Sequence, residues 1–219
     1  MIRVRVALLT AAITAAATVA ACGSGGGGAG HVSNDSCNDT AGSSSYYDDP
    51  GTNGPPVGQQ IAQMPHAHVA PPTRVTYEHN PPTSGCHYNL GYGKAPVSAG
   101  VYSTHIDAEY WVHNLEHGYI VVLYNCGDGT APTACQTDFQ ALRAWYERQG
   151  ADPGLSAVVG QQQAYAKIVV IPWKMDRKFA VVSWNWYDGF DKLDTSPTGE
   201  LQKFVDNHVN HSPEGLGTQ

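Results

Sequence analysis

Residues 113–124, HNLEHGYIVVLY, decide how this chain folds. The second half of the stretch, YIVVLY, is a continuous run of β-branched, aliphatic and aromatic residues, which is typical of a buried strand. Just before it, Asp107 is a candidate helix N-cap and Gly118 a helix stop, so the residues between them predict a short helix or turn. The chain is therefore expected to pass from this short element directly into a buried strand.

Downstream of this stretch, the sequence predicts a helix, two strands and a second helix. Apolar residues recur at helical spacing in residues 137–150, where Gly150 is placed to end the helix. Residues 166–173 and 178–190 are rich in β-branched and aromatic residues and predict two strands, related like a hairpin across the KMDRK segment. Residues 195–209 predict the last helix.

Upstream, residues 66–102 are rich in proline, glycine and tyrosine and have no helical period. They predict an irregular segment with short extended pieces, of which Arg74–Tyr77 (RVTY) is the best. The order of elements predicts an α+β fold: a small mixed or antiparallel sheet with helices packed on one face, preceded by an irregular segment rich in proline, glycine and histidine.

The chain begins with the pattern of a bacterial export signal. Arg3 and Arg5 precede an apolar stretch that ends in VAAC, at Cys22. This order predicts a lipoprotein signal peptide over residues 1–21, with Cys22 as the acylated first residue of the mature chain; an ordinary signal peptide with a chance cysteine is the alternative. Each buried CH₂ of an acyl chain contributes about 0.8 kcal/mol, so several acyl chains would hold the protein firmly to the membrane, which is then a partner. The export signal predicts that the anchored protein lies in the bacterial cell envelope, outside the cytoplasm.

Residues 22–58 predict a flexible tether, because Gly, Ser, Asn and Asp dominate them and long apolar runs are absent. Residues 59–219 then form a single extracytoplasmic α+β domain, which is long enough to bury a core. The formal net charge is −7 and no basic cluster is present, so nucleic acid is not expected as a partner.

Of the five cysteines, four remain once one is assigned to lipid, and an even number in an exported protein predicts two disulfides. Cys126 and Cys135 bracket the turn-rich GDGTAPTA, so their pairing closes the shortest loop. Cys37 and Cys86 then pair by elimination. The alternative, in which Cys86 is a metal ligand beside a histidine, is ranked second because the compartment is oxidising.

Histidines gather in the part of the chain that is least able to form regular structure alone. Ten histidines are present, and seven of them are His66, His68, His79, His87, His105, His113 and His117. Neutral imidazole is the commonest protein metal ligand, and a bound metal holds an irregular segment in one shape. The clustering therefore favours a metal site over a set of scattered surface residues.

Two histidine pairs are the predicted metal ligands. His79 and His87 are separated by a loop with two prolines and a glycine, which can bring both rings to one point. His113 and His117 are four residues apart and lie on one face of a helical turn. The four nitrogens suit a transition metal ion, either a closed tetrahedral zinc or a copper ion. Paired histidines that satisfy buried carbonyls or cap turns remain the alternative.

Other residues add detail to this prediction. Glu116 is expected to orient an imidazole from outside the coordination sphere. Met175 carries a thioether that would favour copper, so copper handling with a metal-transfer partner is favoured over structural zinc, although loop filling also explains this methionine. His66 and His68 would point to the same side of a strand, but a solvated polar loop is the preferred interpretation of that pair.

Two other functions remain open. His113-x-x-Glu116-His117 fits the H-x-x-E-H motif of zinc metallohydrolases, in which the glutamate activates water. Those enzymes carry the motif within a long helix, whereas Gly118 ends this one early. The third possibility is an aromatic-rich structural or interaction module without a metal.

The stretches YEHNPPTSGCHY and HNLEHGYIVVLY together resemble the signature of an uncharacterised bacterial family of secreted or membrane-anchored domains, domain-of-unknown-function family 3105. That signature reads HNPPTSGxHY, followed by HxLEHG and a hydrophobic strand, and the resemblance extends over roughly residues 66–212. The resemblance implies a shared domain in which the four predicted ligands and Glu116 belong to one motif set. It implies no activity.

Overall fold

A computed structural model describes residues 37, 52, 54–126, 135–150 and 166–214. The predicted signal peptide, the predicted lipidation site and most of the predicted tether lie outside these described residues. Within the part of the chain that is described, no helix is both long and apolar enough to cross a membrane.

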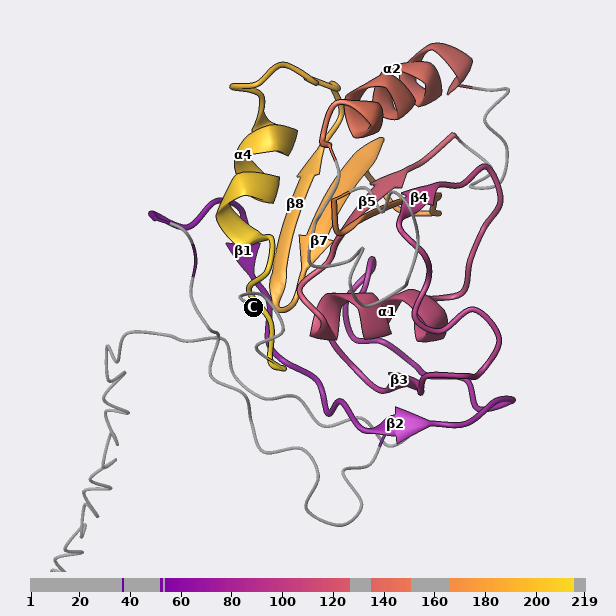
Figure 1. The fold of residues 1–219 in the computed structure, drawn as a ribbon. Helices are drawn as coiled ribbons and strands as arrows, with labels where there is room; N and C mark the ends of the chain where they lie inside the picture. Colours follow the sequence, from indigo (N-terminus) through magenta and orange to yellow (C-terminus); the bar gives the residue numbers. More distant parts are fainter. Residues whose placement is uncertain (1–36, 38–51, 53, 127–134, 151–165, 215–219) are drawn as a thin grey trace, which may run out of the picture.

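Six of the described strands form one mixed sheet, in the order β1-β8-β7-β5-β6-β4 (Figure 1). These strands are β1 Gln59–Gln60, β4 Gly100–Val101, β5 Ile120–Tyr124, β6 Ile168–Pro172, β7 Phe179–Ser183 and β8 Trp186–Phe190. β5 pairs in parallel with β6 and antiparallel with β7. Every residue of β5 is buried, as the continuous apolar run predicted.

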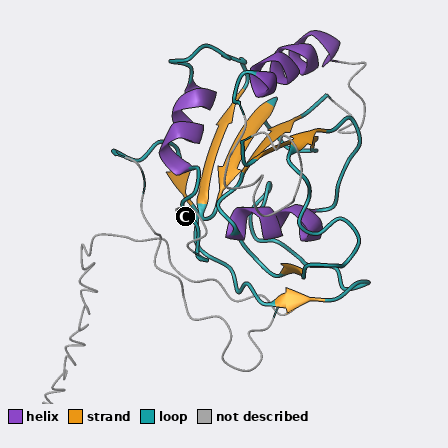
Figure 2. Cartoon of the chain, viewed as in Figure 1, coloured by secondary structure: helices purple, strands orange, loops and turns teal. Residues whose placement is uncertain are grey.

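Helices cover both faces of this sheet (Figure 2). The described helices are α1 Ala108–Glu116, α2 Gln136–Glu147 and α4 Glu200–His208. The alternating residues Ile120, Val122 and Tyr124 of β5 pack in one core with the apolar residues of α2 and α4. Val121 and Leu123 pack in the other core, with α1. The predicted α+β class with a mixed sheet is confirmed.

The arrangement differs from the expected one in three respects. α1 lies on the face opposite α2 and α4, because a central strand that is apolar on both sides needs cover on both sides. Residues 178–190 form two strands, since the chain reverses at Asn185, which has φ of 64°. β6 and β7 do not form a hairpin; β5 lies between them and pairs with each.

Gly118 joins α1 to β5 in a conformation that only glycine adopts readily. Its φ is 77°, and a Cβ there would lie 2.9 Å from Asn210 Cα. The chain on the C-terminal side of α4 therefore packs directly against the turn, and the Asn210 N–H donates to the Gly118 carbonyl at 2.9 Å. This turn fixes the end of α1, where the HNLEHG motif lies.

A second, two-stranded sheet lies beside α1 in Figure 1. It consists of β2 His68–Val69 and β3 His87–Tyr88, which pair in parallel. Both strands come from the segment that the sequence predicts to be irregular. Their register places His68 directly opposite His87.

Candidate metal centre

Three histidines from three different elements converge at one point. His68 lies on β2, His87 on β3 and His113 on α1, and each offers a ligand atom within 4.8 Å of the other two. Their ring centroids form a nearly regular triangle, with separations of 4.8 Å for His68–His87, 5.2 Å for His68–His113 and 5.0 Å for His87–His113. This spacing suits three imidazoles that surround one small ion.

Backbone carbonyls fix the orientation of two of these rings. The Nδ1–H of His87 donates to the Gly85 carbonyl at 2.9 Å, and the Nδ1–H of His113 donates to the Tyr88 carbonyl at 2.7 Å. Since a carbonyl only accepts, Nδ1 carries the proton in each of these hydrogen bonds, and the neutral His113 ring keeps its lone pair on Nε2. Metal-bound histidines are held in this way, with the second ring nitrogen donating to a carbonyl or carboxylate.

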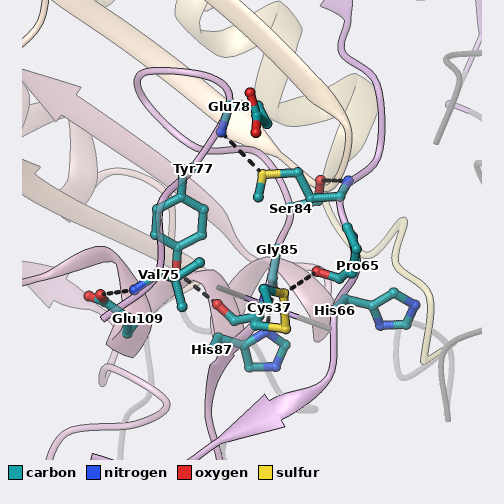
Figure 3. The surroundings of a disulfide bond; sticks show 12 residues. Cys37, Pro65, His66, Val75, Tyr77, Glu78, Ser84, Gly85, His87 and Glu109 are labelled. Atoms are coloured by element: carbon teal, nitrogen blue, oxygen red, sulfur yellow. Dashed lines mark hydrogen bonds between the residues drawn. A yellow bond between two sulfur atoms is a disulfide. The ribbon is translucent and has the colours of Figure 1, made fainter. Parts of the chain in front are cut away.

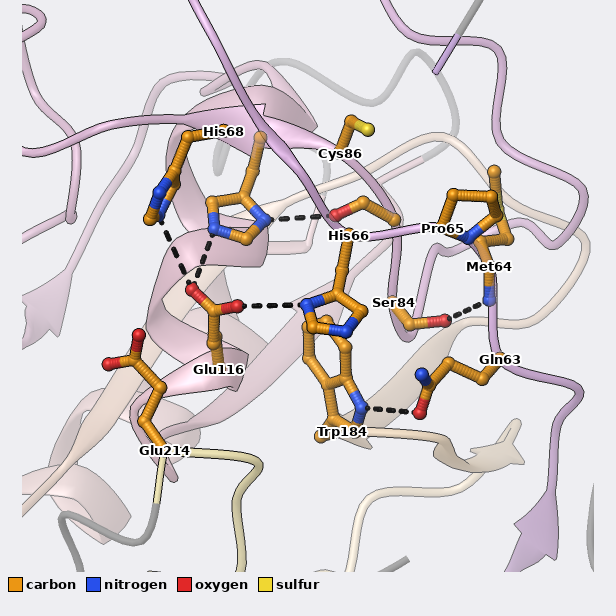
Figure 4. Close-up of polar contacts among 12 residues, drawn as sticks. Gln63, Met64, Pro65, His66, His68, Ser84, Cys86, Glu116, Trp184 and Glu214 are labelled. Atoms are coloured by element: carbon orange, nitrogen blue, oxygen red, sulfur yellow. Dashed lines mark hydrogen bonds and ion pairs between the residues drawn. The ribbon is translucent and has the colours of Figure 1, made fainter. Parts of the chain in front are cut away.

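The Glu116 carboxylate lies at the edge of the histidine cluster (Figure 4). Its Oε2 atom is 2.9 Å from His87 Nε2 and 3.5 Å from His68 Nε2. Its Oε1 atom is 3.2 Å from His66 Nδ1. The side chain of Glu116 is 5% exposed, so these contacts take place away from bulk water.

His117 lies next to this group but has a different partner. As the C-cap of α1, it stacks on His113 with ring centroids 4.7 Å apart. Its Nδ1 atom lies 3.0 Å from Glu214 Oε2. The residues that follow α4 therefore reach the centre through Glu214, whose carboxylate is labelled beside Glu116 in Figure 4.

Burial sets the charge of the centre. It lowers the pKa of His113 to about 4 and also lowers the pKa of His68 and of His117. Burial alone would raise the pKa of Glu116, but hydrogen bonds from two histidines hold it well below its ordinary value. At neutral pH, His68 and His113 are therefore neutral, which is the form that binds metal, and Glu116 is ionised.

The Cys37–Cys86 disulfide lies between the two segments that carry the ligands (Figure 3). Cys86 directly precedes His87, and Cys37 Sγ lies 3.0 Å from the Pro65 carbonyl oxygen, next to His66. Both cysteines are buried. The bond thus links the strand of His87 to the approach of His68, while Cys126 and Cys135 form the second disulfide.

Of the four predicted ligands, the structure brings His87 and His113 into the group, together with His68. His117 stacks against the group, as described above. His79 lies outside it: its Nδ1 atom is 2.6 Å from the Pro81 carbonyl oxygen and its ring contacts Tyr187. It lines a cavity of about 180 Å³ with residues such as Ile61, Met64 and Ser84.

The sequence carried one signal for the third histidine. The H-x-H pair places His66 and His68 on the two sides of a carboxylate, and His68 pairs across β2 and β3 with the predicted ligand His87. The parallel pairing of two-residue strands has no periodic pattern, so nothing in the sequence favoured this pair over a polar loop. The thioether of Met175 packs in the apolar core beneath α1.

The fold and the centre define an α+β domain with a group of three histidines, two of them buried, that can hold a metal ion, and its two disulfides suggest an oxidising, extracytoplasmic location. The chain belongs to the family described as protein of unknown function (DUF3105), whose profile matches residues 68–219. This confirms the resemblance that the two histidine motifs predicted. No curated protein and no solved structure matches the chain significantly.

Proposed function

We propose that this protein is a metal-binding domain of the bacterial cell envelope, anchored to the membrane by acyl chains on Cys22, and that it binds a transition metal ion through His68, His87 and His113. The disulfides support the extracytoplasmic part of the proposal, and the order of residues in the predicted signal peptide supports the anchor.

One observation carries the metal-binding part. The Nδ1–H groups of His87 and His113 donate to the carbonyls of Gly85 and Tyr88, so each ring turns its Nε2 atom toward the group. The ligand atoms of His68, His87 and His113 lie within 4.8 Å of one another, so one metal ion at the centre of the triangle can bind all three.

Zinc and copper both suit three imidazole nitrogens. The sequence favoured copper because of Met175, but this side chain lies in the apolar core and gives that preference no support. The identity of the metal therefore depends on the ligands of the centre itself.

The hydrolase alternative receives less support from the geometry. A general base needs a pKa close to the working pH, and the contacts of Glu116 with His66 and His87 hold its pKa far below that range. In addition, α1 ends at Glu116, so the H-x-x-E-H motif spans the end of a helix of only nine residues.

The centre has one exposed ligand. The side chain of His68 is 38% exposed, whereas that of His87 is 0% exposed. A metal enters or leaves most easily from the side where a ligand can rotate into solvent. This exposure supports a role in which the domain receives a metal from, or delivers it to, a partner protein, and it is less typical of a purely structural ion.

The test is metal analysis of the full-length chain, purified in detergent without a histidine tag. After dialysis against excess Zn²⁺ or Cu²⁺ and then against buffer, elemental analysis is expected to find one bound ion per chain. His87→Ala, which removes a fully buried ligand, is expected to retain none. The proposal would be contradicted by wild-type protein that retains no metal, or by a His87→Ala variant that binds metal like the wild type.

A further inference from the structure

We propose that Glu116 is the fourth ligand of this centre, which becomes a closed site of three nitrogens and one oxygen, and that the carboxylate makes the site select a divalent ion over Cu⁺. This inference rests on the proposed function and names the class of cation that the site takes. His66 is then a positioning residue, which holds the carboxylate in place without touching the metal.

The first support is distance. Zinc–nitrogen and zinc–oxygen bonds of about 2.0–2.2 Å at tetrahedral angles place neighbouring ligand atoms about 3.3–3.5 Å apart. Glu116 Oε2 lies 2.9 Å from His87 Nε2 and 3.5 Å from His68 Nε2. One carboxylate oxygen therefore lies close to two imidazole nitrogens. Its distance to His68 matches the separation that a common ion imposes, and its distance to His87 is shorter by about 0.4–0.6 Å.

The second support is charge. His87 donates from Nδ1 to the Gly85 carbonyl, and on the other side of the ring its Nε2 atom lies 2.9 Å from the carboxylate oxygen. Two acceptors at that distance repel each other unless a proton or a cation lies between them. A proton between them would bridge only His87 and Glu116. A divalent cation can also be coordinated by His68 and His113, which belong to the same group.

The third support is how Glu116 is held. Its other oxygen, Oε1, lies 3.2 Å from His66 Nδ1. The His66 ring meets the edge of Trp184, with centroids 5.3 Å apart, and Trp184 is itself fixed by a hydrogen bond from Nε1 to Gln63 Oε1 at 3.1 Å (Figure 4). Metal-binding carboxylates are commonly hydrogen-bonded in this way through the oxygen that does not bind the metal.

The selectivity follows from the ligand atoms. Cu⁺ prefers soft thiolate and thioether sulfur, whereas carboxylate oxygen with imidazole suits harder divalent ions such as Zn²⁺ and Co²⁺. In the described part of the chain, the sulfur atoms of Cys86, the residue before His87, and of Cys37 are joined in a disulfide and are not free thiolates. Among the described residues, Glu116 is therefore the side chain that decides which oxidation state the site prefers.

Cobalt is the probe, because tetrahedral Co²⁺ absorbs visible light strongly and five- or six-coordinate Co²⁺ absorbs it weakly. The full-length chain, purified without a histidine tag, is titrated with Co²⁺ and then with Zn²⁺ in competition. Glu116→Gln keeps the size of the side chain and removes its charge. Glu109→Gln is the matched control, since Glu109 is also buried on α1 but accepts from the Val75 N–H at 2.9 Å. Near-ultraviolet circular dichroism checks that each variant is folded.

Wild-type protein and Glu109→Gln are expected to give the strong tetrahedral spectrum. Glu116→Gln should lose that spectrum and bind Zn²⁺ more than ~100-fold more weakly. This loss exceeds the ~10–100-fold loss that is typical when a residue that only hydrogen-bonds to a metal ligand is replaced. His66→Phe keeps the ring against Trp184 and removes the N–H; it should keep the tetrahedral spectrum and bind ~10-fold more weakly.

A weak wild-type Co²⁺ spectrum at full occupancy would overturn the four-ligand site without any variant. So would a folded Glu116→Gln variant with the spectrum and affinity of the wild type, even though the three-histidine site of the proposed function would stand. Unchanged affinity in His66→Phe would remove the positioning role. Wild-type protein that takes up no Co²⁺ or Zn²⁺ at all would defeat the proposed function itself.

Discussion

The Nδ1–H of His113 donates to the backbone carbonyl of Tyr88 at 2.7 Å. Tyr88 directly follows His87, so this bond ties the face of α1 to the strand that carries the neighbouring ligand. It also decides which nitrogen of His113 is available. The same bond thus positions the ring and prepares it to bind a metal.

The first prediction separates the ligands in the structure from those expected from sequence. His68→Ala should abolish retention of a stoichiometric metal ion, because it removes one of three converging rings. His79→Ala should bind metal like the wild type, because His79 contacts the Pro81 carbonyl and Tyr187 instead. Elemental analysis after dialysis measures both variants. Loss of metal in His79→Ala with retention in His68→Ala would reverse this assignment.

The second prediction concerns pH. Burial lowers the pKa of His113 to about 4 in the folded state, from 6.5. Between these pH values His113 is protonated in the unfolded chain and neutral in the folded chain. The metal-free protein should therefore lose stability as the pH falls from about 6.5 to about 4. Urea unfolding across this range measures the loss. His113→Gln should flatten the dependence, and an unchanged slope in that variant would contradict the assignment.

The third prediction concerns the Cys37–Cys86 disulfide. Replacing both cysteines by serine should lower the free energy of unfolding by about 2–5 kcal/mol. It should also weaken metal binding, because the bond holds the segment of His87 against the approach of His68. The control is replacement of Cys126 and Cys135, which form the other disulfide. Calorimetric titration should find weaker binding only in the first variant; equal affinities in both would count against a link to the centre.

The fourth prediction concerns the turn between α1 and β5. Gly118→Ala puts a Cβ at φ of 77° and only 2.9 Å from Asn210 Cα, so both strain and overlap destabilise it. Gly150→Ala has nearly the same φ, 78°, with nothing within 4 Å of the new atom. Each should cost more than about 0.4–1 kcal/mol in chemical denaturation, and Gly118→Ala should cost clearly more than Gly150→Ala. Equal losses would mean that the contact with Asn210 relaxes freely.

Much of the fold could be predicted because its strands and helices have strong local patterns. The apolar run Ile120–Tyr124 forms the central strand, and the spacing of Phe139, Leu142 and Trp145 gives α2. The order of the strands in the sheet could not be predicted, since β5, β6 and β7 are almost equally apolar and nothing local decides which one is central. The turn at Asn185 was missed because polar and aromatic residues alternate there as they would in a single strand.

The candidate site was predictable as a set of residues but not as a geometry. Helical spacing pointed to His113 and His117, and the proline- and glycine-containing loop pointed to His79 and His87, of which His87 belongs to the group and His79 does not. The position of His68 depends on the pairing of β2 with β3, and Cys37, bonded to the residue before His87, comes from a distant part of the chain. The cysteine pairing was predicted by elimination among the four cysteines, whereas the pairing of β2 with β3 has no local sequence signal. The glutamate was expected to orient an imidazole, and the structure places its carboxylate within 3.5 Å of three imidazole nitrogens, those of His66, His68 and His87.

The most direct test of the central claim is anomalous X-ray diffraction from crystals of the metal-loaded protein, recorded at the absorption edge of the bound metal. The account predicts one strong peak at the centre of the triangle formed by His68, His87 and His113, about 2.0–2.2 Å from their Nε2 atoms. A peak at His79 or elsewhere on the surface, or none at that triangle when the protein is saturated, would contradict it.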